Sequence, residues 1–123
     1  MPNVIFLMTT PASNEMSEGV FDKMSRAVAQ AVSDTLTLEG PHQVVTYELV
    51  AKRTLNASPV QVLCLASKNE SRLAKLVELR DNIGKALQAL SSDPECAEFY
   101  EVVGKVESWP IMPDGSWAEV PLV

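Results

Sequence analysis

Apolar and polar positions follow one another along the chain in blocks whose periods predict a strand, a helix and two further strands. Residues 3–9 form a short apolar run rich in β-branched side chains, which is typical of a strand. A cap at Ser13 or Asn14 then predicts a helix whose apolar residues recur at helical spacing, and Gly40-Pro41 suits its end. Residues 44–51 and 59–67 have the alternation of strands.

The rest of the chain repeats this order. Residues 67–70 (Ser-Lys-Asn-Glu) fit a capping box that starts a second helix, and residues 91–94 (Ser-Ser-Asp-Pro) end it. Residues 99–106 are predicted as a fourth strand, and residues 107–123 as a C-terminal tail. Strand-helix-strand connections are right-handed. The pattern therefore predicts an α/β fold of two β-α-β units, forming a four-stranded sheet with two helices on one face.

The first and third predicted strands are apolar on both of their faces, as in strands that are buried on both sides. Two helices cover only one face of the sheet. The other face would expose one of two sets of apolar side chains, and the sequence leaves open which: Val4, Phe6, Met8, Val60 and Val62, or Ile5, Leu7, Leu63 and Leu65. Since an exposed apolar patch of this kind marks an association surface, we expect a homo-oligomer in which copies of the chain cover one another's sheets.

Length and charge narrow the function classes. The chain has 123 residues, which predicts a single domain over 1–123, tail included. Its formal net charge is −6, which argues against nucleic-acid or anionic-membrane binding as its main role. The longest apolar run has five residues, Val4 to Met8, so no membrane span is expected. Because no lysine or arginine precedes this run, we do not expect a secretory signal either.

The reactive side chains are few. With two cysteines and one histidine, the sequence predicts neither a disulfide framework nor a metal site. We expect a buried thiol at Cys64, a loop thiol at Cys96 and a reducing, cytoplasmic location. His42 is expected on a surface loop. Since the sequence has no Gly-rich phosphate loop and no Walker motif, no cofactor is expected.

Three features together resemble the tautomerase superfamily, which includes 4-oxalocrotonate tautomerase and the macrophage migration inhibitory factor proteins. They are Met1-Pro2 directly before a strand, Gly40-Pro41 before the strand that includes residues 44–49, and the 59–67 strand that leads into a second helix. The resemblance covers roughly residues 1–106. It implies a homotrimer, removal of Met1, and Pro2 as the catalytic base in keto-enol isomerisation of a small carbonyl compound or keto acid. The tail would reach a neighbouring subunit.

The implied chemistry is physically sound. A free N-terminal proline is a secondary amine, and an ordinary α-amino group has a pKa near ~8. An apolar pocket disfavours the charged ammonium and lowers that pKa, which leaves a neutral base for a proton next to a carbonyl. If Met1 is retained, the Pro2 nitrogen is an amide and cannot act as a base. A non-enzymatic trimer of the same fold is then the alternative.

The arginine that binds acid substrates in the family is not at its usual positions, because residues 12–20 and 42–50 contain no lysine or arginine. Lys52, Arg53 and Lys68 are basic residues near the expected strand ends, and we take them as candidate substrate-binding residues. A ferredoxin-like domain has the same linear order of elements. A dimeric small-ligand or regulatory module of that fold therefore stays open as a second alternative.

Overall fold

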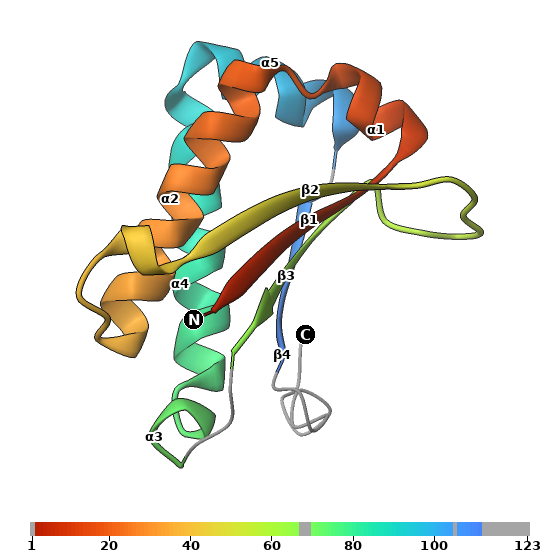
Figure 1. Cartoon of the computed structure of the whole chain (residues 1–123). Helices are drawn as coiled ribbons and strands as arrows, with labels where there is room; N and C mark the ends of the chain where they lie inside the picture. Colours follow the sequence, from red (N-terminus) through yellow and green to blue (C-terminus); the bar gives the residue numbers. More distant parts are fainter. Residues whose placement is uncertain (1, 67–69, 105, 112–123) are drawn as a thin grey trace.

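The computed structural model of the chain describes residues 2–66, 70–104 and 106–111. Four strands form one mixed sheet in the order β2-β1-β3-β4 (Figure 1). β1 pairs in parallel with β2, β3 in parallel with β4, and the central strands β1 and β3 are antiparallel. The strands are β1 (Asn3–Thr9), β2 (Val45–Ala51), β3 (Val60–Leu65) and β4 (Val106–Ile111).

The two long helices, α2 (Glu18–Leu36) and α4 (Leu76–Ala89), pack against each other on one face of this sheet (Figure 1). The α/β architecture of two β-α-β units with two helices on one face is thus confirmed. In each unit the two strands are direct neighbours. A ferredoxin-like, split β-α-β arrangement places another strand between them, so that alternative is wrong.

The core lies between the sheet and the helices. Along β1 and β3 every second side chain is fully buried against the helices, and the intervening ones on the opposite face stay partly exposed. Phe6 and Val62 face each other across the two central strands in the buried layer. The opposite face carries Ile5, Leu7, Leu63 and Leu65, together with Tyr47 and Leu49 of β2, which are about half exposed.

The helix predicted to start at Ser13 or Asn14 is two helices. Thr9 Oγ1 accepts a hydrogen bond from the Ala12 N–H, and Pro11 in the first turn helps to start the short helix α1 (Thr10–Glu15). Ser17 then caps α2 by accepting from the Val20 N–H at 3.1 Å. After α2 a single turn, η1 (Pro41–Gln43), leads into β2.

The second half departs from the prediction on both sides of α4. A short helix α3 (Glu70–Leu73) precedes α4, and η2 (Leu90–Ser92) follows it. Residues 67–69 of the expected capping box lie outside the described residues. The predicted strand over 99–106 is wrong, because residues 94–103 form a further helix, α5 (Pro94–Val103), and β4 begins only at Val106.

The start of α5 explains this difference. The Asp93 carboxylate accepts hydrogen bonds from the N–H groups of Glu95 and Cys96, at 3.0 and 3.4 Å, and Pro94 occupies the first turn. Asp-Pro therefore starts a helix here as well as ending the previous one. β4 includes residues 107–111 of the expected tail, and residues 112–123 lie outside the described residues. No helix in the described part of the chain is long and apolar enough to cross a membrane.

Candidate functional site

Pro2 lies directly before the central strand β1 and is fully buried. Its carbonyl oxygen accepts a hydrogen bond of 3.1 Å from the Val45 N–H, which fixes the start of β1 against β2. On the other side Asn3 pairs with Leu65, so continuing this register places the buried Ala66 beside Pro2. Pro2 therefore occupies an apolar position between the ends of neighbouring strands.

The candidate substrate-binding residues Lys52 and Arg53 lie at the other end of the sheet. They directly follow Ala51, which pairs with Thr9 at the far end of β1. Six steps along a strand span about 20 Å, so within one chain these exposed side chains are not brought to Pro2. Lys68, the third candidate, lies outside the described residues.

The turn η1 is at the same end of the sheet as Pro2, because it immediately precedes the Val45 that binds the Pro2 carbonyl. It carries one titratable side chain, His42, which is exposed as expected for a surface loop. No basic side chain other than His42 lies between residues 36 and 51, as the sequence also shows.

The two thiols are both buried. Burial raises the pKa of Cys64, on β3, to about 12, so this thiol stays protonated at neutral pH. Cys96 is on α5 and fully buried, so its assignment to a loop is wrong, and burial raises the pKa of its thiol as well. Neither thiol is an activated nucleophile. Among the described residues no group of three or more His, Cys, Asp or Glu side chains is placed to hold a metal ion.

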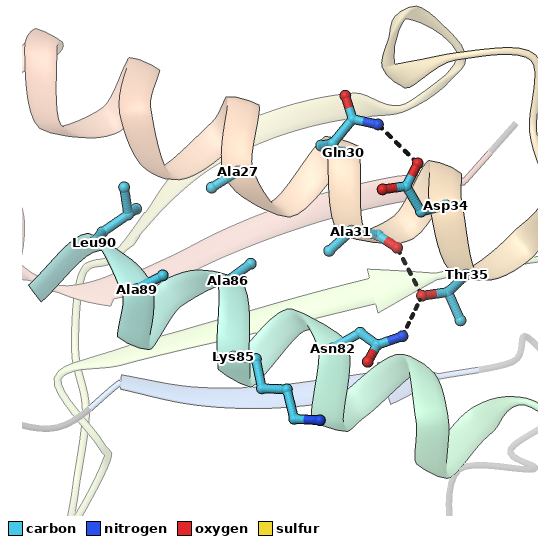
Figure 2. Close-up of a pocket in the computed structure, with 10 residues that line it drawn as sticks. All are labelled: Ala27, Gln30, Ala31, Asp34, Thr35, Asn82, Lys85, Ala86, Ala89 and Leu90. Atoms are coloured by element: carbon cyan, nitrogen blue, oxygen red, sulfur yellow. Dashed lines mark hydrogen bonds between the residues drawn. The ribbon is translucent and has the colours of Figure 1, made fainter.

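A groove of about 480 Å³ runs between α2 and α4 on the outer side of the helix layer (Figure 2). Four of its five polar side chains, those of Gln30, Asp34, Thr35 and Asn82, are hydrogen-bonded. The Gln30 amide donates a hydrogen bond to the Asp34 carboxylate at 2.8 Å. The Asn82 amide donates to the Thr35 hydroxyl at 2.9 Å, and this hydroxyl donates to the Ala31 carbonyl. Pro2 does not line this groove. The groove therefore lies along the contact between two packed helices, and most of its polar side chains already have hydrogen-bond partners.

A second cavity, of about 510 Å³, lies between α2 and the edge strand β2. It is lined from α2 by Ser25, Arg26 and Ala29 and from the other side by His42 and Val44, among others. The sequence analysis did not single out this site. The sequence signal that could have indicated it is Ser25. This polar residue directly follows Met24, which belongs to the apolar stripe of the helix.

Comparison with known proteins supports the fold. No protein-family profile matches the sequence, and no curated protein matches it. Several solved structures are similar, and two of them are described here. One is a macrophage migration inhibitory factor-like protein from Entamoeba histolytica, with a TM-score of 0.56 and 9% identity, over 89% of this chain and 85% of that one. The other is Pt0534 inactivated by 2-oxo-3-pentynoate, with a TM-score of 0.51 and 14% identity, over 89% and 84%. The chain has a tautomerase and macrophage migration inhibitory factor-like fold.

Proposed function

We propose that this protein is a tautomerase-like enzyme in which Pro2, freed by removal of Met1, is the base for keto-enol isomerisation of a small carbonyl compound or keto acid. The observation that supports this proposal most strongly is the position of Pro2, fully buried at the start of the central strand of a tautomerase-like fold. Pt0534, which shares this fold, is inactivated by a keto acid, 2-oxo-3-pentynoate.

The buried position suits a base. Desolvation disfavours a charged ammonium, so the pKa of a free Pro2 amine would lie below that of an ordinary α-amino group. The neutral amine would take a proton from the carbon next to the substrate carbonyl and return it to the other end of the enol system. A cation near the substrate would stabilise the charge that develops on the carbonyl oxygen.

The open face of the sheet supports a homotrimer as the working assembly. This face presents a mostly apolar layer from β1, β2 and β3, including Ile5, Leu49 and Leu63, in which Gln61 is a polar member. Because Lys52 and Arg53 are about 20 Å from Pro2 within one chain, we propose that they bind substrate at the Pro2 of a neighbouring subunit.

Light scattering tests the assembly. Leu63→Asp, on the open face, should reduce the particle mass from that of a trimer to that of a monomer while far-ultraviolet circular dichroism stays that of the parent protein. Gln88→Asp, on the exposed side of α4, is the matched control and should leave the trimer intact. A parent protein that is monomeric at micromolar concentration, or a Leu63→Asp variant that still forms trimers, would contradict the proposed assembly.

Covalent labelling tests the base. The untagged protein should have the mass expected without Met1, and 2-oxo-3-pentynoate should then modify Pro2. In this reaction the amine nitrogen forms a bond to the alkyne carbon distal to the ketone, one π bond is lost, and the adjacent carbon takes the proton. Enol phenylpyruvate should ketonise faster with the protein than in buffer. A variant with one residue inserted before Pro2 is the control, because its amide nitrogen should not react.

A non-enzymatic trimer of the same fold is the second candidate. The distance of Lys52 and Arg53 from Pro2 within the chain favours it, because no described lysine or arginine is placed at Pro2 by the backbone register. Retention of Met1, or ketonisation no faster than in buffer, would establish this candidate and remove the enzymatic proposal.

A further inference from the structure

The open face of the sheet carries two polar side chains at the end where Pro2 lies. Asn3 has the same place as Ile5 in the alternation of β1, so its side chain is on the open face, where it is partly exposed. Tyr47 pairs with Ile5 from the neighbouring strand β2 and is 47% exposed on the same face. On the other side of Asn3 its partner in β3 is the apolar Leu65. An amide and a phenol therefore stand at one end of a mostly apolar surface.

Both side chains lack a hydrogen-bond partner within the described part of the chain. An asparagine amide has two N–H donors and a phenol has one O–H donor. The polar side chains of the groove between α2 and α4 differ, because Asn82 and Thr35 already bind each other there. In the proposed trimer the open face is covered, and a covered polar group without a partner costs free energy. A ligand at this end of the face would supply the partner that the chain does not.

The two donors lie on the side from which a substrate can reach the Pro2 nitrogen. The helix side is closed, because Pro2 and Val4 are fully buried there. Asn3 directly follows Pro2, so their Cα atoms are about 3.8 Å apart. Tyr47 is two residues beyond Val45, whose N–H binds the Pro2 carbonyl, and two strand steps span about 7 Å, a length that a tyrosine side chain covers. Both donors are therefore within reach of a carbonyl group held at the Pro2 nitrogen.

We propose that the Asn3 amide and the Tyr47 hydroxyl stabilise the negative charge that develops on the substrate carbonyl oxygen. This assignment rests on the proposed function and adds two catalytic residues to it. The Pro2 nitrogen takes the proton from the carbon next to the carbonyl, and the electron pair of that C–H bond moves toward the carbonyl oxygen. The N–H and O–H donors bind this oxygen while it is an enolate, and the Pro2 ammonium then returns the proton to it, which gives the enol. Lys52 and Arg53 of a neighbouring subunit are left to hold a substrate carboxylate.

Ketonisation of enol phenylpyruvate tests the two donors. Asn3→Leu removes the amide and keeps the size of the side chain, and Tyr47→Phe removes only the hydroxyl. Each should lower kcat about a hundredfold and leave KM near that of the parent protein, because the bond strengthens as charge develops. Gln61→Leu is the matched control. It removes an amide from the same face at the other end of the sheet, where Gln61 pairs with Leu7, and should leave kcat unchanged.

A binding measurement with 4-nitrophenol examines the donors without catalysis. The phenol and the phenolate absorb at different wavelengths, and donors that bind the oxygen favour the phenolate. At neutral pH the dye should be more ionised with the parent protein than in buffer. Asn3→Leu and Tyr47→Phe should each reduce this increase, and Gln61→Leu should not. Protein labelled at Pro2 by 2-oxo-3-pentynoate should no longer ionise the dye, since the label occupies the same site.

The outcomes separate this assignment from the proposed isomerase function. If Pro2 is labelled but both donor variants have the kcat of Gln61→Leu, the assignment is wrong and the isomerase proposal stands. If enol phenylpyruvate ketonises no faster than in buffer but the dye is ionised in a way that depends on Asn3 and Tyr47, the isomerase proposal is wrong and the donor site stands. A dye that is no more ionised with the parent protein than in buffer overturns the donor site. Tyr47→Phe removes one oxygen atom from a half-exposed side chain, so it keeps the test decisive even if Asn3→Leu does not fold.

Discussion

The two β-α-β halves of the molecule differ in how their long helix returns to the sheet. In the first half the single turn η1 connects α2 to β2, and in the second half η2 and the whole helix α5 lie between α4 and β4 (Figure 1). Both halves place their strands next to each other with the same parallel pairing. The same strand pairing is therefore compatible with a short or a long connection between the helix and the second strand, and the long connection can have a further structural role.

In the second half that role is to close one end of the core. Cys96 and Phe99 of α5 are buried and belong to the main core cluster. Lys23 of α2 forms an ion pair of 2.8 Å with Asp93, the residue that caps α5. Gly19 of α2 lies close to the Glu95 carboxylate, so a Cβ there would stand 2.6 Å from its oxygen and the flexible, exposed Glu95 side chain would have to shift.

The largest expected loss of stability distinguishes the core around β1 from the additional helix α5. Phe6→Ala removes a fully buried ring from the central strand and should lower the free energy of unfolding by about 3–5 kcal/mol, measured by urea denaturation. Phe99→Ala removes the same ring from α5. It should cost less, because we expect α5, at one end of the core, to open without loss of the sheet. Equal costs for both variants would show that α5 is as central as β1.

The strands and their faces were predictable, and the added helix was not. A period of two is a strong signal where one face is buried, so β1, β2 and β3 lie within a residue or two of their predicted bounds. Residues 99–106 contain several β-branched and aromatic side chains, which also suit a helix whose apolar stripe is Cys96, Phe99 and Val103. The capping bonds of Asp93 decide between the two, and these bonds are visible only in three dimensions.

The candidate site could likewise be predicted from the sequence only in part. The position of Pro2 follows from its place before the first strand, so the sequence could predict that it enters the core. The sequence could not show that Lys52 and Arg53 lie at the other end of the sheet, since this depends on the parallel register of β1 and β2. Ser25 is missed because serine is common in helices, and only the surrounding packing leaves its hydroxyl unpartnered.

Removal of the helix caps should give the next largest effects. Ser17→Ala takes away the acceptor for the Val20 N–H and should lower the free energy of unfolding of the whole domain by about 1 kcal/mol. Asp93→Ala takes away the acceptor for two N–H groups of α5. It should increase hydrogen exchange within α5 more than within α2. Equal exchange in the two helices would contradict the separate behaviour of the halves.

Replacing either of two glycines of the second half by alanine should change the stability of the protein, in opposite directions at the two positions. Gly84 lies within α4, and a Cβ there would meet nothing within 4 Å, so Gly84→Ala should stabilise the protein by about 0.5–1 kcal/mol. Gly104 ends α5 at a φ of +86°, which side chains rarely adopt, so Gly104→Ala should destabilise it. Thermal unfolding of both variants measures the two signs, and a stabilising Gly104→Ala would show that α5 ends differently.

The smallest effect concerns the ion pair that joins the halves. The hydrogen bond from Lys23 lowers the pKa of Asp93, and Asp93 in turn raises the pKa of Lys23. A carboxyl with a lowered pKa stabilises the fold above its unfolded pKa of about 3.9, and this contribution is lost as the pH falls through the folded value. A lysine with a raised pKa contributes below about pH 10.4, and its contribution is lost as the pH rises through the folded value. The pair should therefore hold α5 against α2 between these limits.

Because both side chains are partly exposed, solvent and salt weaken the pair, and the change should be modest. The protection factors of the α5 amides, which correct for the slower intrinsic exchange at low pH, should fall on acidification in the parent protein and fall less in Lys23→Met, whose Asp93 has a pKa nearer the ordinary value. Lys85→Met, on the outer side of α4, controls for the loss of one positive charge and should behave as the parent. If Lys23→Met and Lys85→Met show the same acid response, the ion pair does not join the two halves, and α5 is held by the burial of Cys96 and Phe99.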